Sequence, residues 1–369
     1  MPSVTSGKVL ITGANGFISR WIIKTFLDAG FTVRGTVRST SKGEALKELF
    51  KTEKFEYVIV EDISNLVSET NLYLTFTLLL LNRAQDSFDQ YLKDVDVVIH
   101  AAFLMLDPTI DPQADPDVFI KPAVDGTVKV LESILRAGHV MDTVKRVVIL
   151  SSLATIADSS QNPEAVVYDE EHWASLPLKV VQEEGKAADN LMKYAASKIL
   201  AERAAWDLYD LVKHTAKWDL VTLNPVYPIL EPFPTTDLSK LSGSNLYLWS
   251  IIHGEPTSHD CSIYFLAWVD VRDVAEASLK AVTVEEAANN RFIILSDHFI
   301  IQELLDAIHT DDPNGEFDSL GKGTPRSGRD ENPFSVVYSN KKSQEILGIK
   351  YRTIRDSAKD LARTVVSRV

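Results

Sequence analysis

The sequence predicts an α/β fold, in which a doubly wound parallel sheet carries a smaller C-terminal domain. Short apolar runs rich in β-branched residues alternate with longer helical stretches as far as Asn224, a pattern typical of parallel sheets buried on both faces. A glycine-rich turn separates the first such run from the first helical stretch. After Asn224 the chain becomes rich in Pro, Ser, Gly and Thr, and we expect the smaller domain to begin there.

The elements of the larger domain are expected to follow one another in a regular order. The expected strands are 9–12, 31–37, 57–60, 97–100, 146–151 and 220–224, and the expected helices are 16–29, 117–137 and 187–212. Beyond them we expect a strand and a helix within 269–282, a strand at 291–295, a polar loop at 311–332, and helices at 301–309, 343–347 and 354–366. We assign 1–225 and 263–285 to the larger domain, and 226–262 and 286–369 to a substrate-binding domain.

Composition excludes several classes of function. The chain of 369 residues has 52 acidic and 38 basic residues, which gives a formal net charge of −14. Such a chain is poorly suited to bind nucleic acid or an anionic membrane surface. Its single cysteine, Cys261, allows no internal disulfide, and no Cys/His cluster has metal-ligand spacing. Without a signal-peptide pattern or a long apolar run, the expected location is cytoplasmic.

The turn Thr12-Gly-Ala-Asn-Gly-Phe-Ile-Ser19 is the first indication of a ligand. Glycines between a strand and a helix allow the backbone to approach a pyrophosphate, whose charge then lies at the helix N-terminus. This context predicts a Rossmann-type dinucleotide site, although Ser19 replaces the third glycine of the usual pattern. The residues expected to contact the cofactor here are Thr12, Gly13, Asn15, Gly16, Phe17 and Ile18.

The residues after the second strand indicate NADP(H) rather than NAD. An NAD site usually has a carboxylate there for the ribose hydroxyls, but 31–42 contains neither Asp nor Glu. Arg38 and Lys42 instead suit a 2′-phosphate, with solvated surface cations as the alternative. Asp62, after the third strand, either accepts a hydrogen bond from the adenine amino group or caps a helix.

Tyr194 and Lys198 are four residues apart on an expected helix and therefore share one face. An ammonium group one turn away favours the tyrosinate, which makes the tyrosine a better acid near neutral pH. Ser152 follows the fifth expected strand, where its hydroxyl can donate to a substrate carbonyl oxygen. Because ligand crevices lie at the carboxyl ends of parallel strands, the three side chains are expected to converge on the glycine turn.

With these motifs in place, the chain resembles the extended short-chain dehydrogenases/reductases. Within them it is most similar to the branch of dihydroflavonol reductases, cinnamoyl-CoA reductases and fungal aldehyde/ketone reductases. The resemblance spans nearly the whole chain. The matching segments are 12–18, Arg38 with Lys42, 98–102, 121–127, 150–152, 194–198, 224–227, 269–274 and 340–343.

The resemblance implies a role for each matching residue. Ser152 would polarise the carbonyl, Tyr194 would protonate the alkoxide, and Lys198 would assist Tyr194 and bind the nicotinamide ribose. The backbone of Ala101 and Ala102, after a structural His100, and of Pro225 and Val226 would line the nicotinamide. The family often has Gly-Pro shortly after the segment that matches 224–227, but Pro228 and the residues after it depart from this pattern, which puts the substrate-pocket loop in doubt.

One stretch interrupts the resemblance. Residues 67–85 separate Leu66 from Asp86, and removing them leaves a continuous join of the kind found in the family. We hypothesise that this stretch is a translated, unspliced intron, because valine can be encoded from a GT donor and glutamine can end in an AG acceptor. The alternative is a genuine surface helix or lid. Sequencing the mature transcript decides between them.

Together these features predict a carbonyl reductase that uses NADP(H) on a small aldehyde or ketone, as a monomer or homodimer and without a metal. A sugar-nucleotide epimerase or dehydratase is the first alternative, although such enzymes usually hold NAD and have an acidic residue where Arg38 stands. A catalytically inactive NADP-sensing regulator is the second alternative, although it would not need both Tyr194 and Lys198. The physiological substrate cannot be deduced from the sequence.

Overall fold

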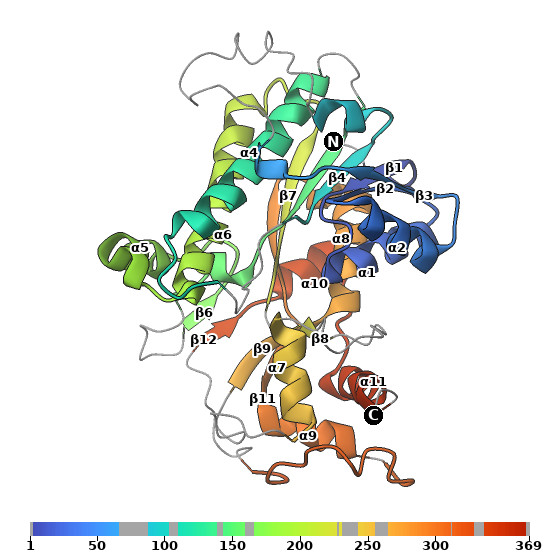
Figure 1. Cartoon of the computed structure of the whole chain (residues 1–369), viewed down its shortest axis with the longest axis vertical. Helices are drawn as coiled ribbons and strands as arrows, with labels where there is room; N and C mark the ends of the chain where they lie inside the picture. The colour runs from blue at the N-terminus through green and yellow to red at the C-terminus, as the bar shows by residue number, and fades with distance from the viewer. Residues whose placement is uncertain are drawn as a thin grey trace.

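A computed structural model of the chain describes residues 3–65, 88–102, 110–138, 143–158, 166–226, 229–230, 243–254, 265–310, 312–327 and 336–366. Figure 1 shows a large α/β body above a smaller lobe, and the C-terminal helix forms part of that lobe.

The larger body is built around a seven-stranded parallel sheet with the order β10-β7-β5-β4-β1-β2-β3. The chain order reverses between β1 and β4, so the carboxyl ends of these two strands are where a ligand crevice is expected. The predicted doubly wound sheet is confirmed. Its strands are β1 (Lys8–Ile11), β2 (Thr32–Val37), β3 (Phe55–Ile59), β4 (Val97–His100), β5 (Arg146–Leu150), β7 (Asp219–Pro225) and β10 (Asn290–Ile294).

Helices cover both faces of this sheet (Figure 1). On one face α4 (Asp117–Gly138) packs against α6 (Asn190–Val212), and on the other α1 (Phe17–Asp28) packs against α8 (Val271–Thr283). Successive strand residues enter different cores: Val9 joins the core under α1 and α8, and Leu10 joins the core under α4 and α6. Burial on both sides explains why the strands appear in the sequence as unbroken apolar runs.

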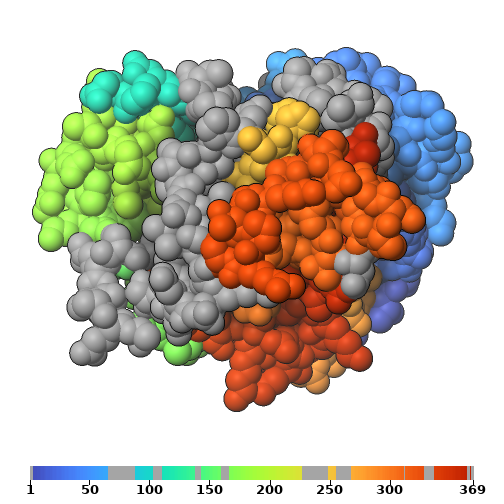
Figure 2. Space-filling model, turned by 90° about the horizontal axis from the view of Figure 1, so that it is seen from below, coloured from blue at the N-terminus to red at the C-terminus, as the bar shows by residue number. Residues whose placement is uncertain are grey.

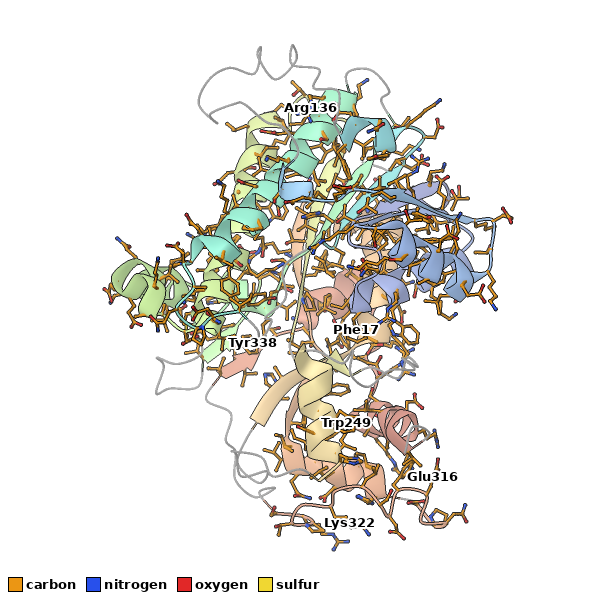
Figure 3. The ribbon with its side chains drawn as sticks, viewed as in Figure 1. Phe17, Arg136, Trp249, Glu316, Lys322 and Tyr338 are labelled. Carbon is orange, nitrogen blue, oxygen red and sulfur yellow. The ribbon has the colours of Figure 1, made fainter. Side chains whose placement is uncertain are left out.

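Three more helices and a strand pair complete this body. They are α2 (Thr40–Phe50), α5 (Leu176–Glu184), α10 (Lys341–Leu347) and the parallel pair of β6 (Val166–Tyr168) with β12 (Val336–Tyr338). Of these, only α10 was predicted. Figure 3 shows Phe17 of α1 and Tyr338 of β12 at the level where the larger body meets the lobe.

The smaller lobe has its own three-stranded sheet of order β11-β9-β8. Its core contains the indole of Trp268, which is 1% exposed and packs edge to face on Phe299. Seen from below, the 300–327 region lies between the N-terminal elements on one side and α5 on the other (Figure 2). The elements of this lobe are β8 (Ile229–Leu230), β9 (Phe265–Asp270), β11 (Asp297–Ile300), α7 (Gly243–Ile252), α9 (Ile301–His309) and α11 (Ile354–Val366).

Two of the predicted domain boundaries are wrong. β10 pairs with β7 in the large sheet, so 286–369 does not belong wholly to the smaller domain. β9 pairs with β8 and β11 in the lobe, so within 263–285 only α8 returns to the larger body. Both errors have the same cause. An apolar run in the sequence indicates a strand, but the neighbour of that strand in a sheet depends on contacts between distant segments, which the run does not reveal.

The hypothesised insertion, 67–85, lies outside the described residues. The described chain on either side of it is held by α4. Lys129 donates from Nζ to the carbonyl oxygen of Ser64, and Arg136 binds both carboxylate oxygens of Asp89 at 3.1 Å. Among the helices that the structure describes, none is long and apolar enough to cross a membrane.

Candidate active site

The glycine turn adopts the close backbone packing that its sequence predicts. Gly13 has φ +64°, and a Cβ placed on it would lie 2.9 Å from the Cα of Ala102, so a larger residue is excluded on both counts. The amide of Ala14 donates to the carbonyl oxygen of Thr36 at 2.9 Å, which ties the turn to β2. Gly16 then caps α1, whose first turn contains no acidic residue, as suits an approaching anion.

A hydrogen-bonded chain joins this turn to the end of β4. Thr12 Oγ1 accepts from the amides of Ala101 and Ala102, each at 3.0 Å. Its hydrogen is therefore available for Nδ1 of His100, also at 3.0 Å. Nε2 of His100 then faces Thr127 Oγ1 at 3.4 Å, and that hydroxyl donates to the carbonyl oxygen of Ala123 at 2.8 Å.

This chain is complete only when His100 is neutral and carries its proton on Nε2. Burial, with the nearby Lys198 as a second cause, lowers the pKa of His100 to about 3. The imidazole therefore cannot act as an acid at neutral pH. It connects two segments of backbone, in keeping with the structural role expected for it from the sequence.

Three cations within β2 and just after it have different environments. Arg34 binds Glu56 and the carbonyl oxygens of Tyr91 and Lys93. Arg38 and Lys42 are exposed, and within the described part of the chain neither has a hydrogen bond or an ion pair. They flank the start of α2, whose first turn has no acidic residue. Their position suits a phosphate group.

Asp62 has a capping role in the structure. Its Oδ1 accepts from the amide of Ser64 at 2.8 Å and from the hydroxyl of Ser64 at 2.6 Å. These bonds cap the short 3₁₀ turn Ile63–Asn65. Of the two roles considered for Asp62, the structure contains the cap, and contact with adenine stays a prediction.

Ser151 and Ser152 follow β5 but have different partners. Ser151 is 4% exposed, and its hydroxyl donates to the carboxylate of Glu202. Ser152 is half-buried, and its Oγ accepts from the amide of Ala154 at 3.2 Å. Since no described group accepts from it, the Ser152 hydrogen is free to be donated to a ligand. The environment thus favours Ser152 over Ser151 as the reactive serine.

Lys198 joins α6 to this strand end. Its Nζ donates to the carbonyl oxygen of Leu150 at 3.1 Å, two residues before Ser152. Tyr194, half-buried, lies one turn earlier on the same helix. Burial lowers the pKa of Lys198 to about 8, while the negative charge of Glu202 acts in the opposite direction. The lysine is therefore cationic at neutral pH and close to its titration range.

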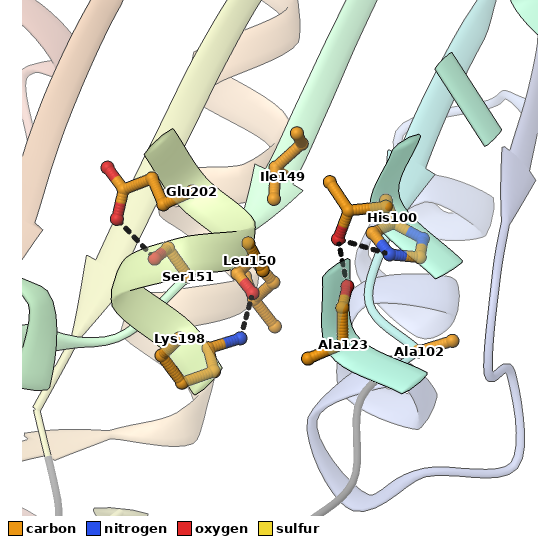
Figure 4. Close-up of a pocket in the computed structure, with 10 residues that line it drawn as sticks. His100, Ala102, Ala123, Ile149, Leu150, Ser151, Lys198 and Glu202 are labelled. Atoms are coloured by element: carbon orange, nitrogen blue, oxygen red, sulfur yellow. Dashed lines mark hydrogen bonds between the residues drawn. The ribbon is translucent and has the colours of Figure 1, made fainter. Parts of the chain in front are cut away.

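A small pocket opens between the ends of β4 and β5, as Figure 4 shows. Lys198, Glu202 and Ser151 line it from one side, and His100 and Ala123 from the other. Thr127, which contacts both His100 and Ala123, also lines the pocket. Pro225 and Val226, at the end of β7, are both buried, and the amide of Val226 donates to the carbonyl oxygen of Ile294 at 3.2 Å. The candidate residues of β4, β5, β7 and α6 thus lie at the same edge of the sheet.

Sequence reasoning missed the charged groups under this edge. Glu202 forms an ion pair with Arg291 of β10 at 2.8 Å, and Asn224 of β7 donates to the same carboxylate at 2.8 Å. A signal was available, since Glu202 continues the four-residue spacing of Tyr194 and Lys198, and Arg291 is a charge inside a buried strand. Among the described residues, no group of His, Cys, Asp and Glu side chains could hold a metal ion.

Comparison with known proteins places this site in context. Residues 9–214 match the family model described as the NAD dependent epimerase/dehydratase family. The chain is 30% identical over 361 residues to the NADPH-dependent methylglyoxal reductase GRE2 of Saccharomyces cerevisiae, covering 97% of this chain and 98% of that protein. It is 34% identical over 367 residues to the ketoreductase azaE of Aspergillus niger, covering 97% of each.

Solved structures show the same likeness. The crystal structure of yeast methylglyoxal/isovaleraldehyde reductase Gre2 complexed with NADPH superimposes with a TM-score of 0.78 and 28% identity, over 98% of this chain and 100% of that one. The Gre2 structure from Candida albicans, also in complex with NADPH, gives a TM-score of 0.79 with 28% identity, over 98% and 99% of the two chains.

Proposed function

The chain belongs to the NAD dependent epimerase/dehydratase family, and within that family we propose that it is an NADPH-dependent reductase converting an aldehyde or ketone to the alcohol. The observation that carries the proposal is the bond from Lys198 to Leu150. It fixes the helix that bears Tyr194 against the strand end that bears Ser152. The NADPH-dependent reductases among the similar proteins support the same function.

The residues present fit NADPH. Gly13 and Gly16 would allow the backbone at the N-terminus of α1 to approach a pyrophosphate, and Arg38 and Lys42 would supply cations for a 2′-phosphate. The remaining expected contacts are the Thr12 turn, Ala101 and Ala102 after β4, and Pro225 and Val226 after β7. When bound, NADPH supplies the hydride that adds to the carbonyl carbon.

The chain's own residues would supply the proton and hold the substrate. Ser152 donates a hydrogen bond to the carbonyl oxygen, which becomes more negative as the hydride arrives. Tyr194 transfers its proton to that oxygen and completes the alcohol. The Lys198 ammonium would stabilise the tyrosinate that remains and would help to hold the nicotinamide ribose. The substrate would thus gain the hydride from the cofactor and the proton from Tyr194.

The alternatives are less well supported. A sugar-nucleotide epimerase holding NAD would be expected to have a carboxylate after β2, where Arg38 and Lys42 stand. A regulator without activity would not need the Lys198 contact with the strand end. The cytoplasmic location and the monomeric or homodimeric state stay predictions.

The test is NADPH oxidation, followed by nicotinamide absorbance, with a panel of small aldehydes, α-ketoesters and aryl ketones. NADH serves as the control cofactor. We expect turnover with NADPH and at least a tenfold lower kcat/KM with NADH, since Arg38 and Lys42 gain nothing from a cofactor without the 2′-phosphate. Tight NADPH binding without turnover of any carbonyl would favour the alternative of an inactive NADP-sensing regulator. Equal turnover with NADPH and NADH would contradict the proposed recognition of the 2′-phosphate by Arg38.

A further inference from the structure

Glu202 is a buried carboxylate one helical turn beyond Lys198. It is 1% exposed, and four side chains donate to it. Ser151 and Asn224 bond to one oxygen, and Thr222 and Arg291 bond to the other. Burial alone would raise the pKa of Glu202, but the Arg291 charge and the hydrogen bonds outweigh it, so the pKa lies below its ordinary value. The carboxylate is therefore ionised.

Arg291 is itself held on every side. Its Nη1 donates to the carbonyl oxygens of Glu170 at 2.6 Å and His172 at 2.8 Å, and its Nη2 donates to Thr155 Oγ1 at 3.2 Å. The guanidinium also lies 3.7 Å from the centre of the Trp173 ring. A buried ion pair is tolerated when its remaining donors and acceptors are satisfied in this way. The position of the Glu202 carboxylate is thus set by groups outside α6.

The same network holds the backbone of Ser152. Its carbonyl oxygen accepts from Thr155 Oγ1 at 2.9 Å and from Nδ2 of Asn224 at 3.3 Å. That Asn224 amide also binds Glu202, and the neighbouring Ser151 donates to the same carboxylate. One charged side chain therefore connects α6, the end of β5 and the end of β7.

Glu202 also provides a negative charge one helical turn from Lys198, which favours the charged form of the lysine. Of the described residues that line the pocket between β4 and β5, the titratable groups beside Lys198 are the neutral His100 of β4 and Glu202 of its own helix, and Tyr194 lies one turn earlier on α6. The Leu150 carbonyl of β5 accepts a hydrogen bond from Lys198, Ile149 and Ser151 line the same pocket, and α4 contributes Thr127 and Ala123 to it. Among the described residues that line this pocket, Glu202 is the only carboxylate.

We propose that Glu202, held by Arg291, is a positioning residue for the whole catalytic group: it anchors the strand end that carries Ser152, and its charge stabilises the Lys198 ammonium. This inference rests on the proposed reductase function. The proposal adds Glu202 and Arg291 to the residues on which the reaction depends. Neither side chain would contact substrate or cofactor. Together they fix the position of Ser152 and keep Lys198 charged.

The first test is the pH profile of kcat/KM for Glu202→Gln beside Glu202→Asp. Lys198 must be protonated in the proposed mechanism, so wild-type activity falls as pH rises through about 8. Loss of a neighbouring negative charge moves the midpoint of that fall downward by about one pH unit or more for Gln. Asp keeps the charge, so its midpoint stays with the wild type. A merely structural role would lower activity equally at all pH values, and a Gln midpoint that coincides with the wild type overturns the proposal.

Ser151→Ala is the companion variant, because it keeps every charge and loses only one link in the network, so it can be measured even if Glu202→Gln does not fold. We expect kcat about tenfold lower at every pH, as for one lost positioning hydrogen bond, with the midpoint unchanged. A kcat within twofold of the wild type would overturn the anchoring role.

NADPH binding, measured by fluorescence over the same pH range, separates this inference from the proposed function. Failure of the wild type to reduce any carbonyl, with NADPH still bound, overturns the function alone. The pH at which binding weakens then reports on Lys198 directly. It should be lower for Glu202→Gln than for the wild type, and identical binding profiles overturn the stabilising role of Glu202.

Discussion

The two ends of the candidate crevice differ in how their charges are held. At the catalytic end, formed by Ser152, Lys198, Glu202 and Arg291, every charged group lies inside the protein and is bound by other side chains or carbonyl oxygens. At the phosphate end, formed by Arg38 and Lys42, both cations are exposed and have no described protein partner. The groups at the catalytic end are held by the fold, whereas we expect the two cations at the phosphate end to be held by the ligand.

This difference has an energetic consequence. Holding the catalytic groups in place before the substrate arrives removes part of the ordering cost from the reaction step. Unpaired cations at the phosphate end need not break an internal ion pair to meet a phosphate, so their attraction contributes to binding. Changes at the catalytic end should therefore lower kcat, and changes at the phosphate end should weaken NADPH binding.

The largest loss short of the proton donor itself is expected for Lys198→Met. Methionine has a side chain of similar length to lysine, but it lacks the ammonium group. The variant therefore loses the hydrogen bond to Leu150 and the charge that stabilises the tyrosinate. We expect kcat to fall by about 10²- to 10⁴-fold, the range for loss of acid–base assistance, and NADPH binding to weaken moderately. Steady-state kinetics and fluorescence titration measure the two effects. A kcat within tenfold of the wild type would contradict the role of Lys198.

The phosphate end is probed by replacing Arg38 and Lys42 together with alanine. Each substitution removes a charge-assisted contact worth about 1.5 kcal/mol, so the Kd for NADPH should rise by roughly 100-fold while the binding of NADH stays the same. Lys47→Ala is the matched control, since it removes a cation from the same helix farther from the end of β2. Equal weakening of NADPH and NADH would show that the two cations do not recognise the 2′-phosphate.

The smallest effect is expected from deleting 67–85. Lys129 and Arg136 hold the flanking chain from points seven residues apart on α4 (136 − 129 = 7), or about 10 Å along the helix. The shortened link from Asn65 to Phe88 can span roughly 14 Å. We expect kcat/KM within about twofold and a free energy of unfolding within about 1 kcal/mol of the full chain. A deletion variant that does not fold would show that the segment is integral to the protein.

Much of the larger body was predictable because its signals are local. Strand β4 and helices α9 and α11 have the predicted bounds, and the glycine turn, Ser152 and the Tyr194 helix lie at one sheet edge as expected. A parallel strand buried on both faces is apolar throughout, so it can be recognised from its sequence. The turn before α1 needs a positive φ at position 13, and the glycine that meets this need is also recognisable in the sequence.

The parts that were missed depend on contacts between distant segments. The pairing of β6 with β12 joins residues about 170 positions apart, and the polar helix α2 buries only Gly43 and Leu46. Glu202 and Arg291 are 89 positions apart, and neither lies in a sequence motif that would identify the other as its ion-pair partner. Burial and pairing of charges emerge only from the folded sheet.

The most direct test of the account is Tyr194→Phe, assayed for carbonyl reduction and for NADPH binding on the same preparation. Because the phenolic hydroxyl is the proposed proton donor and the rest of the site is held without it, we predict a kcat lower by at least about a hundredfold with the Kd for NADPH unchanged within about twofold. Turnover that survives the substitution, or equal loss of binding and turnover, would contradict the account.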